Sequence, residues 1–198
     1  MSVPVPPSSV SLPAPPASVS LPAATTYVQE SVDRYLEKGY SYSRSANPTV
    51  RALENKLTDL EGGTDTVCFG TGMAAINGLY MAYLNAGDHA IVSDVVYGGT
   101  YRLSTKVYSR FGVQFSFVDT ADAANVRKAI RPNTKLILTE TPANPTLKLT
   151  DLRAVSDVAR EHRILHAVDN TFLTPYYQRP YLPIKLYHFN SNKSGSTK

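Results

Sequence analysis

The chain has 198 residues, of which 42% are hydrophobic and 18% charged, and its formal net charge is +4. This composition is typical of a folded globular protein, and its basic residues are scattered, so we expect neither wholesale disorder nor a nucleic-acid partner. The single cysteine, Cys68, excludes an internal disulfide, and the apolar run "TVCF" around it favours a small buried residue over a reactive thiol. Because no apolar run has the length of a membrane span and no signal-like segment opens the chain, we expect a cytoplasmic protein without a membrane partner.

Residues 1–24 differ from the rest, being rich in Pro, Ser, Val and Ala, and the hexapeptide "SVSLPA" occurs in them twice. Proline lacks a backbone N–H, so we expect an extended or disordered segment here. Residues 25–60 are assigned to an N-terminal arm and a first helix. The stretch "NPTVRALENKLTDLEGG" begins with a capping Asn47 and ends at two glycines. Its apolar residues recur at helical spacing, namely Val50, Leu53, Leu57 and Leu60.

Residues 61–180 are assigned to one domain, in which predicted strands and helices alternate from residue 66 to residue 170. Apolar or period-two runs predict strands at 66–69, 90–94, 113–119, 135–140 and 163–170. Helices are predicted at about 73–84, 101–111, 122–130 and 151–162. This alternation predicts an α/β fold with a mainly parallel sheet and helices on both faces, in three layers. In such sheets, ligands bind beyond the carboxyl ends of the strands.

Each predicted strand ends in a polar or glycine-containing cluster, which supplies the candidate site residues. In "GTGMAA", Gly72 and Met73 lie where a strand leads into a helix, and free N–H groups there attract a phosphate, although such glycines also serve ordinary turns. Asp169 follows an apolar strand and is either a cap for the next turn or a counter-charge for a cationic ring nitrogen. Tyr97, in "YGGT", either packs in the fold or stacks on a flat cofactor.

Two further stretches carry candidate residues. "ETPANP" places Glu140 and Asn144 on a loop restrained by prolines. "YSR" places the hydroxyl of Tyr42 two residues from the guanidinium of Arg44, a pair suited to a phosphate, although an exposed arginine is often simply solvated.

Taken in order, these motifs resemble one family over residues 24–180. The motifs are "ATTYVQES", "YSYSRSANPT", "GTGMAAI", "YGGTYRL", "ETPANPTLKLTDL" and "AVDNTFLTPYYQRP". The chain is similar to the pyridoxal 5′-phosphate (PLP) enzymes of cysteine and methionine metabolism: cystathionine γ-synthase, cystathionine γ-lyase, methionine γ-lyase and O-acylhomoserine sulfhydrylase. The resemblance implies the large domain of the fold type I aminotransferase architecture and a reaction at Cγ or Cβ of sulfur amino acids. It also implies a homotetramer whose active sites are shared between subunits.

The resemblance also implies a role for each candidate. Gly72 and Met73 would donate N–H groups to the cofactor phosphate, and Tyr42 and Arg44 would bind the same phosphate from a neighbouring subunit. Tyr97 would stack on the cofactor ring and assist proton transfer.

At the carboxyl ends of the last two predicted strands, the resemblance implies three more roles. Asp169 would pair with the ring nitrogen, Asn144 would contact the phenolic oxygen of the ring, and Glu140 would support the loop.

The last segment, 181–198, departs from the family pattern. Family members carry a motif of the type H-S-x-T-K whose lysine forms the Schiff base with the cofactor. Here Lys198 follows a threonine but comes four residues late, and Lys193 comes one residue early and lacks the threonine. We therefore expect a truncated cofactor domain in which a catalytic role for Lys198 is doubtful.

Three hypotheses follow. The first is a PLP enzyme of the transsulfuration type, and the second is a catalytically incompetent fragment that associates with a full-length paralogue. The third, a nicotinamide-binding oxidoreductase, lacks its G-x-G-x-x-G fingerprint here.

Overall fold

The computed structural model describes residues 26, 31, 42–44, 46–179 and 187–189. The Pro-rich segment 1–24 and most of the tail 181–198, with Lys193 and Lys198, lie outside these residues. The chain divides into two units, Met1–Leu53 and Glu54–Lys198. The domain boundaries expected from the sequence stay a prediction.

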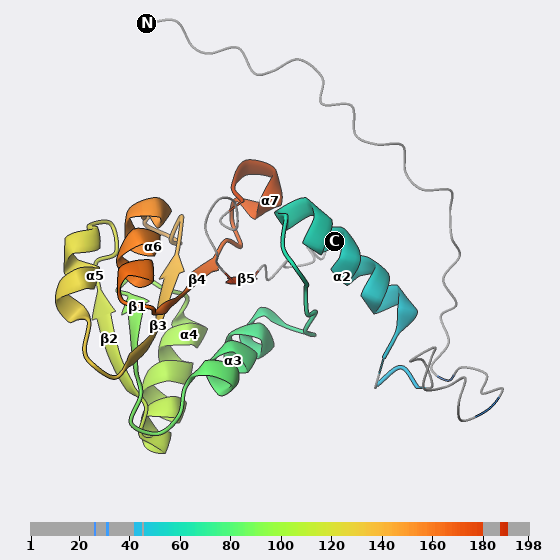
Figure 1. Ribbon diagram of the computed structural model, residues 1–198, viewed down its shortest axis with the longest axis horizontal. Coiled ribbons are helices and arrows are strands. Elements are labelled where there is room, and N and C mark those ends of the chain that lie inside the picture. The colour runs from blue at the N-terminus through green and yellow to red at the C-terminus, as the bar shows by residue number, and fades with distance from the viewer. Residues whose placement is uncertain (1–25, 27–30, 32–41, 45, 180–186, 190–198) are drawn as a thin grey trace, which may run out of the picture. The chain divides into compact units, whose positions relative to one another are not determined.

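The second unit is built on a parallel five-stranded sheet with the order β2-β1-β3-β4-β5 (Figure 1). The strands are β1 (His89–Ser93), β2 (Gln114–Val118), β3 (Thr134–Glu140), β4 (Leu165–Asp169) and β5 (Tyr187–Phe189). All four pairings of neighbouring strands are parallel. The parallel sheet expected from the alternation of elements is therefore confirmed.

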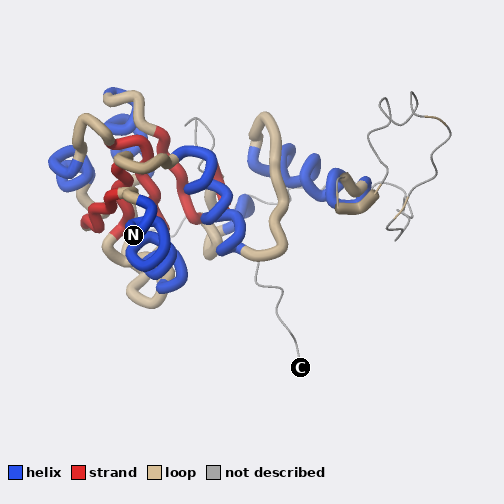
Figure 2. Tube along the Cα trace, turned by 90° about the horizontal axis from the view of Figure 1, so that it is seen from below, coloured by secondary structure: helices blue, strands red, loops and turns tan. Residues whose placement is uncertain are grey.

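Helices cover both faces of this sheet, as Figures 1 and 2 show. On one face lie α3 (Gly72–Tyr83) and α4 (Gly98–Arg102), which continues as a π-turn at Leu103–Val107 and a 3₁₀ turn at Tyr108–Phe111. On the other face lie α5 (Ala123–Ala129) and α6 (Leu152–Glu161). The chain also forms α2 (Pro48–Glu61) and the short α7 (Thr174–Tyr177). Each predicted helix is present, within a few residues at either end.

Helix starts follow the capping residues in the sequence. The side chain of Asn47 accepts the N–H of Thr49 at 2.8 Å before α2, and Thr71 Oγ1 accepts the N–H of Ala74 at 3.1 Å before α3. The aspartates before α5 and α6 cap in the same way. These bonds satisfy N–H groups that a helix cannot pair internally, so the starts are encoded locally.

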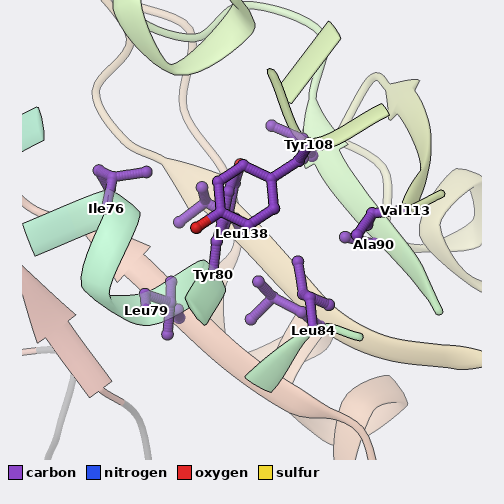
Figure 3. Close-up of a cluster of buried hydrophobic side chains, with 11 residues drawn as sticks. Ile76, Leu79, Tyr80, Leu84, Ala90, Tyr108, Val113 and Leu138 are labelled. Carbon is purple, nitrogen blue, oxygen red and sulfur yellow. The ribbon is translucent and has the colours of Figure 1, made fainter. Parts of the chain in front are cut away.

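The hydrophobic core has two parts because strand side chains alternate between the faces. On the face that α3 covers, side chains of β1 and β3 such as Ala90 and Leu138 pack with Leu79 and the fully buried Tyr80 (Figure 3). Toward α5 and α6, the core contains Ile91, Val126, Ile137, Val155, Val158, Ala159 and Ile164. Because both faces of the sheet are packed, the residues at its carboxyl edge are held in fixed positions.

The ring of Tyr80 sits at the centre of the first core cluster. It meets Tyr108 edge-on at 5.1 Å between ring centroids, and its hydroxyl lies 3.0 Å from Ser104 Oγ. Ser104 belongs to the π-turn, and its Oγ also donates to the carbonyl of Thr100 at 2.8 Å. The widened turn therefore supplies a polar partner to a tyrosine that is otherwise surrounded by apolar groups.

One predicted element is absent: residues 66–69 do not form a strand, and that prediction was wrong. A strand needs a neighbour to complete its hydrogen bonds, and none of the described strands pairs with this segment. Polar groups of residues 66–69 form hydrogen bonds with side chains of α2 instead. Cys68 N–H donates to Glu54 Oε1 at 2.9 Å, and Thr66 Oγ1 lies 2.7 Å from Thr58 Oγ1.

Cys68 is only partly buried, not fully buried as expected, and Val67 and Phe69 beside it are exposed. Burial, and secondarily the charge of Glu54, raise the pKa of Cys68, so its thiol stays protonated near neutral pH.

Across the described residues, every helix is too short or too polar to span a bilayer.

Candidate functional site

The order of the strands locates the crevice where a ligand would bind. After β1 the chain runs into α4 on one face, and after β3 it runs toward α6 on the other face. Because β1 and β3 are neighbours and their connections diverge, the topology predicts a crevice at the carboxyl edge of the sheet. Tyr97 follows β1, Asn144 follows β3, and Glu140 and Asp169 are the last residues of β3 and β4. The topology thus brings four of the predicted site residues to one edge.

Glu140 joins the two sides of this crevice. It is only 7% exposed, and its Oε2 accepts the backbone N–H of Tyr97 at 2.7 Å. The backbone N–H of Asn144, four residues along the chain, also lies near this carboxylate and lowers its pKa. The resemblance implies that Glu140 supports its own loop, and the structure shows that it holds the loop after β1.

Glu140 and Asp169 are direct neighbours across β3 and β4, in parallel register. By the alternation of strand side chains, both point to the face that α3 and α4 cover. Burial is the largest influence and raises the pKa of Glu140; the negative charge of Asp169 adds to this, and the N–H groups of Tyr97 and Asn144 oppose it. The edge therefore concentrates negative charge where a cationic group of a ligand would be stabilised.

Asp169 is half-buried and firmly held. Its Oδ1 accepts the N–H of Thr171 at 3.1 Å and also the Thr171 hydroxyl, while its carbonyl accepts the N–H of Thr141 at 3.3 Å. The turn-capping alternative for Asp169 is therefore observed. The same bonds orient its carboxylate, as a counter-charge for a ligand requires.

The ring of Tyr97 rests against a glycine. A Cβ on Gly99 would lie 2.5 Å from Cε1 of Tyr97 and 2.7 Å from Sδ of Met73, so only glycine leaves room for this arrangement. Tyr97 is 53% exposed, with the rest of its side chain against this cradle. The structure therefore brings Tyr97 next to Met73, two candidates that are 24 residues apart in the sequence.

The start of α3 offers donors beside this ring. Thr71 satisfies the N–H of Ala74 through its hydroxyl and its carbonyl, and the carbonyl also accepts the N–H of Ala75 at 3.2 Å. The N–H groups of Gly72 and Met73, the first two of the helix, have no acceptor within it. They point outward at the positive end of the helix dipole, an arrangement suited to an anion.

A clamp that the sequence analysis missed lies at the same edge. Lys148 Nζ is 3.0 Å from both carboxylate oxygens of Asp94 and 2.8 Å from Oδ1 of Asp119. It thereby ties the loop after β3, which carries Asn144, to the ends of β1 and β2. The only available signal was an aspartate directly after each of these strands, which does not identify the lysine partner.

The remaining candidates are not placed at this edge by the structure. Tyr42 and Arg44 belong to the first unit, where the Arg44 guanidinium lies over the Tyr42 ring at 5.6 Å from its centroid. Lys193 and Lys198 lie outside the described residues, so the doubtful role of Lys198 stays a prediction.

A model of one protein family, described as Cys/Met metabolism PLP-dependent enzyme, matches residues 14–184. The chain belongs to this family. Membership confirms the resemblance drawn from the motifs and the dependence of the family on PLP, and it leaves no support for the nicotinamide alternative.

Curated relatives in this family have several activities. The chain is 51% identical over 156 residues to a cystathionine gamma-lyase of Bacillus subtilis, covering 79% of this chain and 40% of the relative. It is 48% identical over 157 residues to the cystathionine beta-lyase MetC of the same organism, with the same coverage. A probable cystathionine gamma-synthase of Herpetosiphon aurantiacus is 50% identical over 156 residues, which are 79% of this chain and 48% of the relative. The chain thus spans less than half the length of these relatives.

Solved structures of the family confirm the fold. The metB protein of Corynebacterium glutamicum has a TM-score of 0.79 and 42% identity, covering 83% of this chain and 43% of that one. A cystathionine gamma-lyase of Lactobacillus plantarum, solved with L-serine, has a TM-score of 0.76 and 44% identity, covering 81% of this chain and 42% of that one.

Proposed function

We propose that the protein acts in a PLP-dependent reaction of the transsulfuration type, an elimination or replacement at Cγ or Cβ of sulfur amino acids such as cystathionine, methionine or homoserine esters. The observation that carries this proposal is the meeting of Tyr97, Glu140, Asn144 and Asp169 at the β1/β3 crevice, beside the free start of α3. The relatives, two cystathionine lyases and a probable cystathionine gamma-synthase, support the substrate class.

The residues present fit PLP. Its phosphate matches the outward N–H groups of Gly72 and Met73, and its flat ring matches the face of Tyr97 on the Gly99 cradle. A protonated ring nitrogen matches the carboxylate of Asp169, in a charge-assisted hydrogen bond. When bound, this cofactor supplies an electron sink for negative charge that develops at the substrate α-carbon.

The protein's own residues would bind the cofactor and orient it. Asp169, held by Thr171, would place its negative charge against the ring nitrogen and so favour the protonated ring. Asn144 would contact the phenolic oxygen of the ring. The hydroxyl of Tyr97 would move a proton near the substrate.

Assembly completes the proposal. Tyr42 and Arg44 of a second copy would bind the phosphate, which makes a homo-oligomer with shared sites the expected active form. The sulfur amino acid is the small-molecule partner in this proposal, and the cytoplasmic location stays a prediction.

Titration of the purified chain with PLP, followed by visible absorbance, tests the binding part. We expect Asp169→Asn to weaken binding about ten- to hundredfold, the factor for losing a hydrogen bond between charged groups. Asp157→Asn is the matched control, because Asp157 pairs with Arg160 on the exposed side of α6. Equal affinities of Asp169→Asn and wild type would contradict the assigned role.

Release of product from cystathionine, methionine and homoserine esters, measured on the same preparations, tests the reaction. Cofactor binding without any turnover would instead favour the second hypothesis, in which the chain associates with a full-length paralogue. Co-purification of the two chains would then be the deciding measurement.

A further inference from the structure

Side-chain bonds replace the backbone ladder where β1 and β3 approach the site. Backbone pairing of the two strands ends at Val92 and Leu138. Beyond that pair, the N–H of Glu140 donates to Ser93 Oγ at 3.3 Å, and the Glu140 carboxylate reaches the N–H of Tyr97 at 2.7 Å. The two loops that line the crevice are therefore joined by hydrogen bonds to side chains rather than by the ladder.

The carboxylate of Glu140, the last residue of β3, meets backbone N–H groups of both loops. The N–H of Tyr97, the residue before α4, donates to it at 2.7 Å, and the N–H of Asn144, in the loop that Glu140 begins, lies close enough to lower its pKa. A buried carboxylate is costly unless such donors satisfy it. Because hydrogen bonds to a charged acceptor are stronger than neutral ones, this one side chain restrains both loops at once.

Apart from this bond, the carbonyl of Tyr97 accepts the N–H of Tyr101 at 3.1 Å, in the first turn of α4, and the ring makes the remaining contacts. No side chain caps α4 at Tyr97, and the ring lies against Gly99 and Met73. A shift of the Tyr97 backbone would move the ring off this cradle. Asn144, on its side, depends on a loop whose far end is anchored by Lys148.

We propose that Glu140 is a positioning residue, which sets the distance between Tyr97 and Asn144 so that both meet the same ligand beside Asp169. It holds the two loops through their backbone N–H groups and does not itself contact the cofactor. The proposal rests on the proposed function in so far as Tyr97 and Asn144 are cofactor-binding residues.

Amide hydrogen exchange, resolved by residue with NMR on the chain without added cofactor, tests the positioning part. In Glu140→Gln one acceptor oxygen becomes an amide group that donates. We expect the amides of Tyr97 and Asn144 to exchange about ten- to hundredfold faster, while the amides of β3 from Leu136 to Leu138 keep their rates. Glu161→Gln is the matched control, since Glu161, the last residue of α6, is exposed and pairs with Arg127 of α5.

Should Glu140→Gln not fold, Glu140→Asp serves instead. It keeps the charge but is one methylene shorter, so it cannot reach both donors, and the same two amides should exchange faster. Wild-type rates at Tyr97 and Asn144 in a folded variant would overturn the proposal. Equal acceleration throughout β3 would also overturn it, because Glu140 would then serve only the stability of the fold.

A second measurement distinguishes a failure of this proposal from a failure of the proposed function on which it rests. PLP affinity of the wild type and Glu140→Gln is measured on the same samples. If the wild type binds no cofactor while only the two amides respond, the proposed function fails and the positioning role stands. If cofactor binds equally to both chains and the amides are unchanged, the positioning role fails and the function stands.

Discussion

Acid should destabilise the sheet through His166, which lies in β4 three residues before Asp169. The imidazole is 2% exposed, and its two nitrogens lie 2.8 Å from Ser156 Oγ and 2.9 Å from Thr139 Oγ1. Both hydroxyls can rotate to donate or to accept, so they satisfy the neutral ring in either tautomer. Burial lowers the pKa of His166 from 6.5 to about 3, because a charged ring would lose its hydration.

The direction of the effect follows from proton binding. The folded state takes up a proton on His166 only near pH 3, whereas the unfolded chain takes it up near pH 6.5. The stability that comes from the neutral ring is therefore complete above about pH 6.5 and is lost progressively as the pH falls toward 3. Each pH unit in this window costs about 1.4 kcal/mol, so His166 alone removes roughly 2 kcal/mol of unfolding free energy at pH 5.

Urea unfolding at pH 7.5 and pH 5 measures this loss. In His166→Gln the side chain keeps a donor and an acceptor but does not titrate, so its stability should fall by about 2 kcal/mol less than that of the wild type over the same interval. His89→Gln is a parallel case, because burial, and secondarily the charge of Arg131, lower the pKa of His89 to about 4. Equal losses in His166→Gln and wild type would refute the reasoning.

Two further predictions concern the site. Gly99→Ala places a Cβ within 2.5 Å of the Tyr97 ring, so we expect a loss of about 1–3 kcal/mol in urea unfolding and a displaced ring; Gly98→Ala, which meets only the flexible end of Arg102 at 3.2 Å, is the control. Lys148→Met removes two partly exposed ion pairs, so its urea midpoint should fall at low ionic strength and return close to the wild-type value in about 1 M salt. A deficit that persists in salt would show that packing, and not charge, explains the role of Lys148.

The helices and most strands could be predicted from the sequence because their causes are local. Capping residues such as Asn47 and Asp151 mark helix starts, and apolar periodicity separates α6 from its neighbouring strands. The run 66–69 has the same strand-like composition but remains irregular. Whether an apolar run becomes a strand depends on a partner strand, which no short window of sequence specifies.

The order of the motifs alone was enough to predict which chemical groups lie at or just beyond the strand ends: Tyr97, Glu140, Asn144 and Asp169. Glu140 and Asp169 are the last residues of their strands, and Tyr97 and Asn144 lie four residues beyond β1 and β3. Motif order did not predict three contacts: Glu140 binds the backbone N–H of Tyr97, Glu140 lies beside Asp169 in register, and Lys148 ties the loop after β3 to Asp94 and Asp119. These contacts join residues 29 to 54 positions apart. They depend on strand order and register, which arise from packing the whole sheet against both layers of helices.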